Sequence, residues 1–388
     1  MQLIRAFNDR RLADSKELRE ALFTCLDCRA CETACPNDIH PGQLSLHKRA
    51  ELMPDGLPRR LRRILTNAPL LHAGMMEFGM GAMRILYQQT GLRHWLRSSG
   101  LLHSLPKLER LDRYLPEIPR KPARASLAEL VPAAGVKKGV VGYFLGCAMN
   151  VLFPEAALSA VRVLSLLGYD VLTPRGIVCC GAPQMTMGEI DSAKEMARRN
   201  MRAYDEVEII VTDCAACGAE MKGYANLLNE DQAVRFSAKV RDFAEFVEPF
   251  IDNAEILPGS YTWHAPCHLA HAQGICDPPK RILKQITGEF LELTEEDRCC
   301  GSAGIYWLTN PQIADNALDR KLRFIRETSA ETIVTSNPGC VLQLLAGKSD
   351  TDEWKVKYLS EVLEVAMQGR KVNSESTQES DLMLTNNK

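Results

Sequence analysis

The 14 cysteines of this 388-residue chain fall into three groups along the sequence. The first group is Cys25, Cys28, Cys31 and Cys35. The second group is Cys147, Cys179, Cys180, Cys214 and Cys217. The third group is Cys267, Cys276, Cys299, Cys300 and Cys340. The mixed-charge N-terminus shows no export signal, and thiols persist in the reducing cytosol, so this grouping indicates metal binding or redox chemistry rather than disulfides.

The first group has the spacing of a bacterial ferredoxin motif. The segment CLDCRACETACP (25–36) matches C-x2-C-x2-C-x3-C-P, in which thiolates bind a [4Fe-4S] cluster and the fourth cysteine ligates a second cluster. No cysteine precedes Cys25, so each of those two clusters lacks ligands. Three interpretations stay open: an earlier motif is missing, Cys35 closes the first cluster, or another subunit completes the arrangement. Zinc is the weaker alternative, because zinc sites usually combine two widely separated C-x2-C pairs.

The second and third groups repeat one longer motif. A lone cysteine is followed 32 positions later by Cys-Cys-Gly in both groups, and Cys147 and Cys267 are offset by 120 positions, as are Cys179 and Cys299. The last cysteines of the two groups are offset by 123 positions. Two matches at one offset predict two homologous half-domains that face one another. Adjacent cysteines followed by glycine require a tight turn.

The two copies differ by one thiol. The first copy offers five, Cys147, Cys179, Cys180, Cys214 and Cys217. The second copy offers four, Cys267, Cys299, Cys300 and Cys340, because Asn337 replaces the first thiol of the terminal pair. Four thiolates suit a cubane iron-sulfur cluster and a tetrahedral zinc ion equally well.

The pattern of elements predicts an α+β multidomain protein. From Lys138 onward, short β-type runs alternate with longer helical runs, which favours α/β units with mainly parallel strands. Cysteines follow the predicted strands, at the edge where such sheets bind ligands. We expect a ferredoxin-type helical domain (1–56), a helical segment with a Pro-rich linker (57–136), two α/β cysteine-rich domains (137–255 and 256–368) and a disordered tail (369–388).

Net charge and the distribution of apolar and charged residues limit the classes of partner and the location expected for this protein. The formal net charge is -2, which gives no reason to expect nucleic acid as a partner. No apolar run approaches the roughly 18 residues of a spanning helix, so we expect a cytoplasmic protein. Between Arg59 and Arg124, 13 Lys or Arg stand against 4 acidic residues. This segment suits an acidic partner or the anionic inner face of the membrane, and the simpler interpretation is a helical bundle with a solvated basic face.

Several residues carry weaker signals. His264, His268 and His271 surround Cys267. Hydrogen bonding to a cluster, or capping of a helix start, is favoured for them over metal ligation or proton relay. Cys276 lies outside both repeats and is expected to be a structural thiol. The segment GMGAMR (79–84) imitates a dinucleotide-binding loop but lacks its last glycine and follows no strand. The sequence therefore has no credible flavin or nicotinamide fingerprint.

The motifs resemble those of a known family over about residues 1–368. CLDCRACETACP, FLGCAMN, CCGAP, CAACG, HAPCHLAHAQ, CCGSAGIY and SNPGC are similar to motifs of CCG-domain proteins. These include the B subunit of heterodisulfide reductase, lactate-utilisation proteins, the anaerobic glycerol-3-phosphate dehydrogenase C subunit and, above all, the glycolate oxidase iron-sulfur subunit. That family normally carries two ferredoxin motifs, so the resemblance implies an N-terminally shortened chain or an internal start.

The resemblance also implies cofactors. It implies a ferredoxin-type [4Fe-4S] cluster at the first cysteine group and a noncubane [4Fe-4S] cluster at the five thiols of the first copy. The second copy is expected to hold a [4Fe-4S] cluster or zinc. FAD is expected on a partner subunit only.

The function implied is that of an oxidoreductase subunit. A separate flavoprotein subunit oxidises a 2-hydroxy acid, glycolate or D-lactate, and this chain passes single electrons to a quinone or another acceptor. Substrate oxidation then occurs outside this chain, which has no catalytic residues of its own. The alternative is a thiol/disulfide reductase subunit of heterodisulfide reductase type. A third class is a zinc-stabilised interaction module without redox function.

Overall fold

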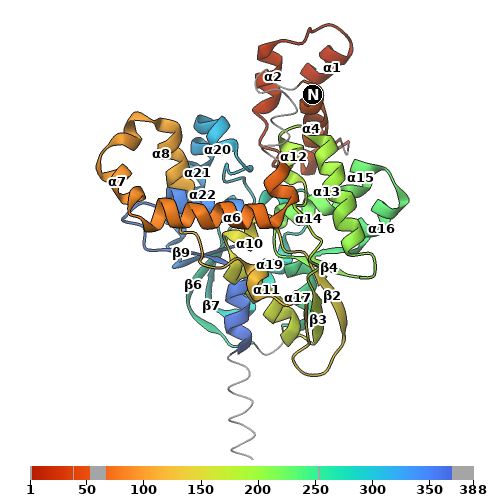
Figure 1. Ribbon diagram of the computed structural model, residues 1–388, viewed down its shortest axis with the longest axis vertical. Coiled ribbons are helices and arrows are strands. Elements are labelled where there is room, and N and C mark those ends of the chain that lie inside the picture. Colours follow the sequence, from red (N-terminus) through yellow and green to blue (C-terminus); the bar gives the residue numbers. More distant parts are fainter. Residues whose placement is uncertain (1, 38, 53–66, 252–253, 369–388) are drawn as a thin grey trace, which may run out of the picture.

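The computed structural model describes residues 2–37, 39–52, 67–251 and 254–368, and its centre is built from two sheets (Figure 1). The first sheet has the strand order β1-β3-β2-β4-β5. Its strands are β1 (Leu130–Val131), β2 (Gly139–Tyr143), β3 (Tyr169–Leu172), β4 (Ile210–Thr212) and β5 (Val240–Asp242). The short strand β1 is antiparallel to β3, and the other neighbours are parallel.

The second sheet repeats this topology. It has the strand order β7-β6-β8-β9, and all neighbours are parallel. Its strands are β6 (Leu257–Trp263), β7 (Thr287–Leu291), β8 (Thr332–Thr335) and β9 (Lys355–Tyr358). In both sheets the first strand of the repeat lies between the second and the third, so the two halves share one arrangement. The predicted mixture of helices with mainly parallel sheets is confirmed.

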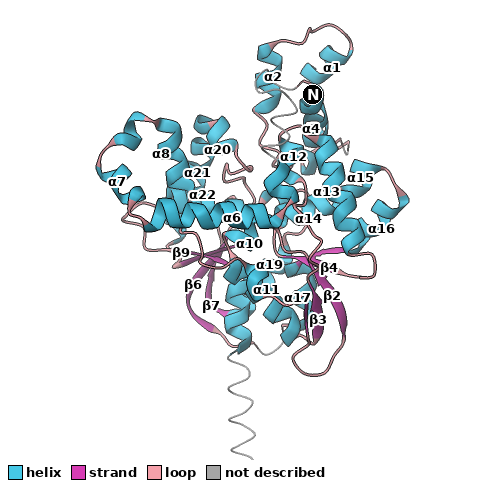
Figure 2. Cartoon of the chain, in the orientation of Figure 1, coloured by secondary structure: helices cyan, strands magenta, loops and turns pink. Residues whose placement is uncertain are grey.

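Helices connect the strands in both halves. The first half contains α10 (Cys147–Val151), α11 (Pro154–Leu166), α12 (Ala182–Thr186), α13 (Ile190–Ala203), α14 (Ala215–Lys222), α15 (Tyr224–Leu228), α16 (Asp231–Lys239) and α17 (Phe243–Val247). The second half contains α18 (Cys267–Ala270), α19 (Asp277–Ile286), α20 (Tyr306–Thr309), α21 (Pro311–Thr328) and α22 (Pro338–Gly347). In Figure 2 the strands form two separate groups, with α11, α17 and α19 between them.

The two halves share one hydrophobic core. Val141 and Val211 of the first sheet belong to the same buried cluster as Trp263 and Val334 of the second. The halves also exchange their last helices: α17 follows the first sheet and packs on α19, whereas the helix over residues 359–368 packs on α11. There Ser360 donates a hydrogen bond to the Ala156 carbonyl oxygen at 3.0 Å. Burial of this shared surface fixes the two halves to each other.

The N-terminal segment is helical and has a small core of its own. It consists of α1 (Gln2–Asn8), α2 (Lys16–Phe23), α3 (Ala30–Thr33) and α4 (Pro41–Glu51). Ile4, Leu18, Leu22 and Leu52 form the core. The Tyr306 hydroxyl donates a hydrogen bond to the Thr24 carbonyl oxygen at 2.6 Å and so ties this segment to the second half. The boundaries of this and the other predicted domains stay predictions.

The helical segment between these parts forms a bent arm. It consists of α6 (Ala73–Met83), the π-helix η1 (Arg84–Gln89), α7 (Leu92–Ser98), the 3-10 helix η2 (Leu101–Ser104), α8 (Pro106–Tyr114) and α9 (Ala123–Ser126). The Tyr114 ring stacks on Trp307 with a centroid separation of 4.1 Å. Within the described ranges, none of the helices is both long enough and apolar enough to span a bilayer. The first ten residues of the predicted helical segment (57–66) and the predicted disordered tail (369–388) lie outside the residues that the structure describes.

Several basic residues of this arm form ion pairs with acidic residues of the same chain. The guanidinium groups of Arg93 and Arg97 bind the buried Asp112 carboxylate at 2.7 and 2.6 Å. Arg110 binds Asp315 on α21 at 2.6 Å. These contacts favour the simpler of the interpretations made for this segment, in which its basic residues belong to a helical bundle.

Candidate metal centres

Three loops of the first half bring five thiols together. The parallel strands β2, β3 and β4 end at the same edge of the sheet, where open α/β sheets bind ligands. Cys147 begins α10 after β2, the Cys179-Cys180 pair follows β3, and Cys214 precedes α14 after β4. Cys217 lies in the first turn of α14. The sheet topology therefore explains why residues up to 70 positions apart share one place.

The thiols of this first site contact one another. The Sγ atoms of Cys147 and Cys179 are 3.7 Å apart, and Cys180 interacts electrostatically with both Cys179 and Cys217. The hydrogen bond with Cys179, together with burial, raises the pKa of Cys147 well above its usual range. Interactions with Cys179 and Cys217 instead lower the pKa of Cys180 to about 7. Such a cluster cannot hold several thiolates without a cation, which is the environment that a metal centre supplies.

Two buried polar residues hold the Cys-Cys loop in place. Asn200 accepts a hydrogen bond from the Val178 N–H at 2.9 Å and donates one to the Cys179 carbonyl oxygen at 3.0 Å. The Tyr224 hydroxyl donates to the Cys180 carbonyl oxygen at 2.6 Å. Neither side chain is exposed. Neither residue was predicted from the sequence, where the single signal is a polar group on the apolar face of a helix.

The second site is built in the same way from four thiols. Cys267 begins α18 after β6, Cys299 and Cys300 follow β7, and Cys340 lies in α22 after β8. All four are buried. Interaction with Cys299, together with burial, raises the pKa of Cys267 well above its usual range. Cys299 lowers the pKa of Cys300, but Cys340 and burial raise it well above its usual range. The Gly301 N–H donates to the Cys299 Sγ at 3.4 Å.

Each Cys-Cys pair is followed by a glycine in the left-handed region. Gly181 has φ +100° and Gly301 has φ +89°. A Cβ atom at Gly301 would lie 2.4 Å from the Ala314 carbonyl oxygen, so no other residue fits there without a shift of the backbone. The tight turn that the Cys-Cys-Gly pattern predicts is therefore present in both copies.

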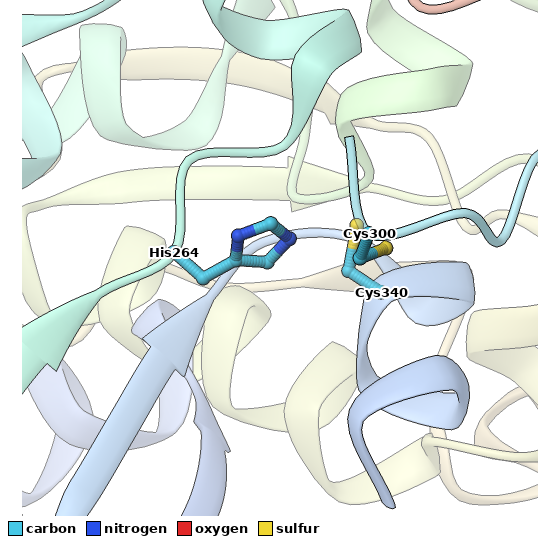
Figure 3. A group of neighbouring side chains, drawn as sticks. All are labelled: His264, Cys300 and Cys340. Carbon is cyan, nitrogen blue, oxygen red and sulfur yellow. The ribbon is translucent and has the colours of Figure 1, made fainter. Parts of the chain in front are cut away.

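The second site also has an imidazole beside its thiols. His264, Cys300 and Cys340 each place a ligand atom within 4.8 Å of the others (Figure 3). The His264 side chain is not exposed, and burial lowers its pKa well below the usual range, so the ring is neutral. The buried Lys321 ammonium donates to the carbonyl oxygens of Glu295 and Glu296 and places a positive charge near these thiols.

The other two histidines have different surroundings. The His268 Nδ1 lies 3.7 Å from the Cys267 Sγ, and its Nε2 lies 3.6 Å from an Asp27 carboxylate oxygen. Burial opposes a charge on this ring, but hydrogen bonds to Asp27 and Cys267 raise the pKa of His268 to about 10. His271 contacts the Thr33 hydroxyl at 3.2 Å. Both histidines thus link the second half to the N-terminal segment.

The first cysteine group lies against the second site. Burial raises the pKa of Cys28, with smaller contributions from the charges of Cys267 and Cys25. The charges of Cys25 and Cys28 also contribute to the raised pKa of Cys31, which is caused mainly by burial. These influences indicate that Cys25, Cys28 and Cys31 lie near one another and that Cys28 lies near Cys267 of the second site.

One cavity joins the two copies. It has a volume of about 690 Å³, and all nine thiols of the two repeats line it together with Asp27 and Arg29 of the N-terminal segment. Buried thiols that line an open space instead of packing on apolar side chains are suited to bind inorganic clusters or metal ions. The residues present therefore fit the metal centres that the motifs predict.

Asn337 connects the two sites. Its Oδ1 accepts a hydrogen bond from the Ala216 N–H at 3.2 Å and lies 3.8 Å from the Cys214 Sγ. Its Nδ2 donates to the Cys340 Sγ at 3.5 Å. The residue that replaces a thiol in the second copy thus contacts cysteines of both copies. Cys276, by contrast, is exposed and lies outside both sites.

Comparison with known proteins also identifies two repeated cysteine-rich domains. The profile of the cysteine-rich CCG domain matches residues 141–222 and 261–345, which contain all nine thiols of the two sites. The probable glycolate oxidase iron-sulfur subunit of Bacillus subtilis is 31% identical over 363 residues, which cover 89% of this chain and 81% of that protein. The chain belongs to the glycolate oxidase iron-sulfur subunit family.

Two further relatives cover much of the chain. The glycolate oxidase iron-sulfur subunit of Escherichia coli is 27% identical over 89% of this chain and 83% of its own length. Lactate utilization protein A of Geobacillus kaustophilus is 28% identical over 53% of this chain and 89% of its own length. The predicted family is therefore confirmed, and this member of the glycolate oxidase iron-sulfur subunit family is an iron-sulfur oxidoreductase subunit.

Proposed function

We propose that the chain is the electron-transfer subunit of a flavin-dependent 2-hydroxy-acid dehydrogenase. The observation that carries this proposal is the meeting of the thiols of both repeats around one cavity, with the ferredoxin-type motif beside it. The relatives named for glycolate oxidase and lactate utilization support glycolate or D-lactate as the substrate. A separate flavoprotein subunit with FAD oxidises that substrate, and a quinone or another acceptor receives the electrons.

The proposed ligands are thirteen of the cysteines, all except Cys276, which lies outside the repeated motifs. The N-terminal segment is a ferredoxin-type domain that holds a [4Fe-4S] cluster through Cys25, Cys28, Cys31 and Cys35. The first cysteine-rich domain holds a noncubane [4Fe-4S] cluster, and the second holds a [4Fe-4S] cluster or zinc. Bound clusters accept and release single electrons, which divides the two-electron oxidation of a hydroxy acid into steps.

The chain itself positions and protects these centres. Backbone N–H groups of Asp27 and Gly301 donate to the Sγ atoms of Cys25 and Cys299, a contact that raises the reduction potential of a cluster. The buried Lys321 ammonium offsets negative charge at the second site. The Asp27–His268 contact brings the first cysteine group next to Cys267, which keeps successive electron carriers close together.

A second candidate is a thiol/disulfide reductase subunit. The cavity favours it, because its volume of about 690 Å³ leaves space beside the five-thiol site for a small organic disulfide. Glu220 lines this cavity, and burial raises its pKa to about 8, so its carboxyl group is protonated at neutral pH and able to donate a proton to a leaving thiolate. Electrons would have to be supplied to the clusters by a separate reductant.

Purification of the tagged full chain from its host under anaerobic conditions distinguishes the two candidates. We expect a flavoprotein to copurify, and the complex to reduce a quinone analogue with glycolate or D-lactate as the electron donor. The flavoprotein without this chain should lose at least about 90% of that quinone reduction, because the electrons have no path to the acceptor.

Two outcomes would contradict the leading proposal. The first is a purified complex without flavin, which would have no group to oxidise the hydroxy acid. The second is undiminished quinone reduction by the flavoprotein alone, which would show that this chain is not needed for electron transfer. Reduction of an organic disulfide by the dithionite-reduced chain, with no response to hydroxy acids, would instead support the second candidate.

A further inference from the structure

His264 occupies the position that Phe144 occupies in the first copy. Each residue lies three positions before the lone cysteine of its repeat. The Phe144 N–H donates to the Val211 carbonyl oxygen at 2.8 Å, and the His264 N–H donates to the Val334 carbonyl oxygen at 2.9 Å. These hydrogen bonds join corresponding strands, and neither side chain is exposed. The two backbones therefore match, and only the side chain has changed.

The copies differ at a second equivalent position. Cys214 lies three residues before Cys217, and Asn337 lies three residues before Cys340. The Asn337 Oδ1 accepts a hydrogen bond from the Ala216 N–H of the first half, so this side chain does not serve the second site as a thiol would. The second copy has thus lost one thiol and gained one imidazole relative to the first.

The imidazole is buried without a hydrogen bond. Within the part of the chain that the structure describes, neither the Nδ1 nor the Nε2 of His264 has a hydrogen-bond partner. The ring points toward the sulfur atoms of Cys300 and Cys340 (Figure 3). A buried polar group left unpaired is unfavourable, so native proteins normally provide a partner for it. The nearby Lys321 ammonium, itself a donor, is already bonded to the carbonyl oxygens of Glu295 and Glu296.

The chemistry of the surrounding atoms identifies the missing partner. A neutral imidazole nitrogen and cysteine thiolates are common ligands of zinc, and both also bind iron. A cation placed among His264, Cys300 and Cys340 would satisfy the ring nitrogen and the charge of the thiolates together. Phe144 offers no such ligand to the first site.

We propose that His264 supplies a nitrogen ligand, alongside Cys300 and Cys340, to the metal centre of the second cysteine-rich domain. The second centre is then a mixed nitrogen and sulfur site for a thiophilic cation, zinc or a cluster iron, whereas the first centre is held by thiolates alone. This inference rests on the proposed function, since it takes a metal to be present at the second site.

The test compares three full-length proteins labelled with ¹⁵N-histidine and purified anaerobically. They are the wild type, His264→Phe, which introduces the residue of the first copy, and His94→Phe, which changes an exposed histidine on α7. Metal and sulfide content are measured for each. Pulsed EPR of the reduced protein detects a nitrogen bonded to cluster iron, and X-ray absorption detects a zinc–nitrogen bond of about 2.0 Å.

We expect a nitrogen ligand in the wild type and in His94→Phe. In His264→Phe this signal should disappear and the metal content of the second site should fall at least tenfold, while the other centres are unchanged. Metal bound by sulfur alone in the wild type, or an unchanged nitrogen signal in His264→Phe, would overturn the inference and leave the proposed function intact. A wild-type chain without metal at the second site would overturn both.

Metal-free protein separates ligand loss from misfolding. Phenylalanine removes two unpaired ring nitrogens from the interior, and Phe144 shows that the equivalent backbone accepts this side chain. Metal-free His264→Phe should therefore melt at a temperature no lower than that of the metal-free wild type. A melting temperature clearly lower without metal would indicate a packing role for His264 and would count against the inference.

Discussion

Replacing Cys180 with serine is expected to remove the metal centre of the first cysteine-rich domain and to lower hydroxy-acid-dependent acceptor reduction by at least about 100-fold. Cys180 interacts with two other thiols of this site, Cys179 and Cys217, which lower its pKa. Its pKa of about 7 makes it the thiol most readily present as a thiolate, and a serine hydroxyl does not ionise in this range. The measurements are iron and sulfide per chain and the rate of quinone-analogue reduction.

A matched substitution controls for the loss of a thiol as such. Cys276→Ser changes an exposed cysteine outside both sites and should leave metal content and rate unchanged. The loop itself should persist in Cys180→Ser, because Asn200 and Tyr224 bind backbone carbonyl oxygens and not the thiols. Wild-type metal content and rate in Cys180→Ser would show that this thiol is not a ligand.

Replacing Arg49 with alanine is expected to lower the free energy of unfolding by about 3–5 kcal/mol and to loosen the N-terminal segment. The Arg49 guanidinium is buried and donates to the carbonyl oxygens of Leu22, Cys25 and Thr186. It therefore joins the end of α2, the first cysteine of the ferredoxin-type motif and the end of α12. Alanine would leave these carbonyl groups without this donor and would open a cavity beside Phe23.

Urea denaturation and limited proteolysis measure this effect. In Arg49→Ala, cleavage between the N-terminal segment and the cysteine-rich domains should accelerate at least tenfold, and the first cluster should be lost more readily on exposure to air. Arg49→Lys keeps the charge but not the planar set of donors. Its stability and its rate of cleavage should therefore lie between those of the wild type and of Arg49→Ala. Arg202→Ala, on the exposed face of α13, is the control. Wild-type stability in Arg49→Ala would refute the role of this residue in attaching the segment.

The sequence allowed the sheets and the thiol groups to be predicted because the signals are local. The buried strand Ile210–Thr212 ends just before Cys214, and strand ends of parallel sheets meet at one edge. The constant offset between the copies predicted two similar halves. Their order of strands, β3-β2-β4-β5 and β7-β6-β8-β9, agrees with that prediction.

Other features depend on contacts between distant residues. Nothing in the sequence indicates that Asn337 binds the opposite copy, or that Asn200 and Tyr224 hold the Cys-Cys loop. Three histidines near Cys267 looked alike, but His264 faces two thiols while His268 faces Asp27. The positive charge of residues 59–124 left open whether this segment docks on a partner or membrane or forms a helical bundle, because the sequence does not show that Arg93 and Arg110 bind Asp112 and Asp315.

Quantification of iron, acid-labile sulfide and zinc in the anaerobically purified full chain, with EPR of the reduced protein, tests whether these thiols hold iron-sulfur clusters. We expect iron and sulfide in nearly equal amounts, at least about eight of each per chain, together with EPR signals of more than one reduced cluster. Zinc alone, without iron or sulfide, would contradict it.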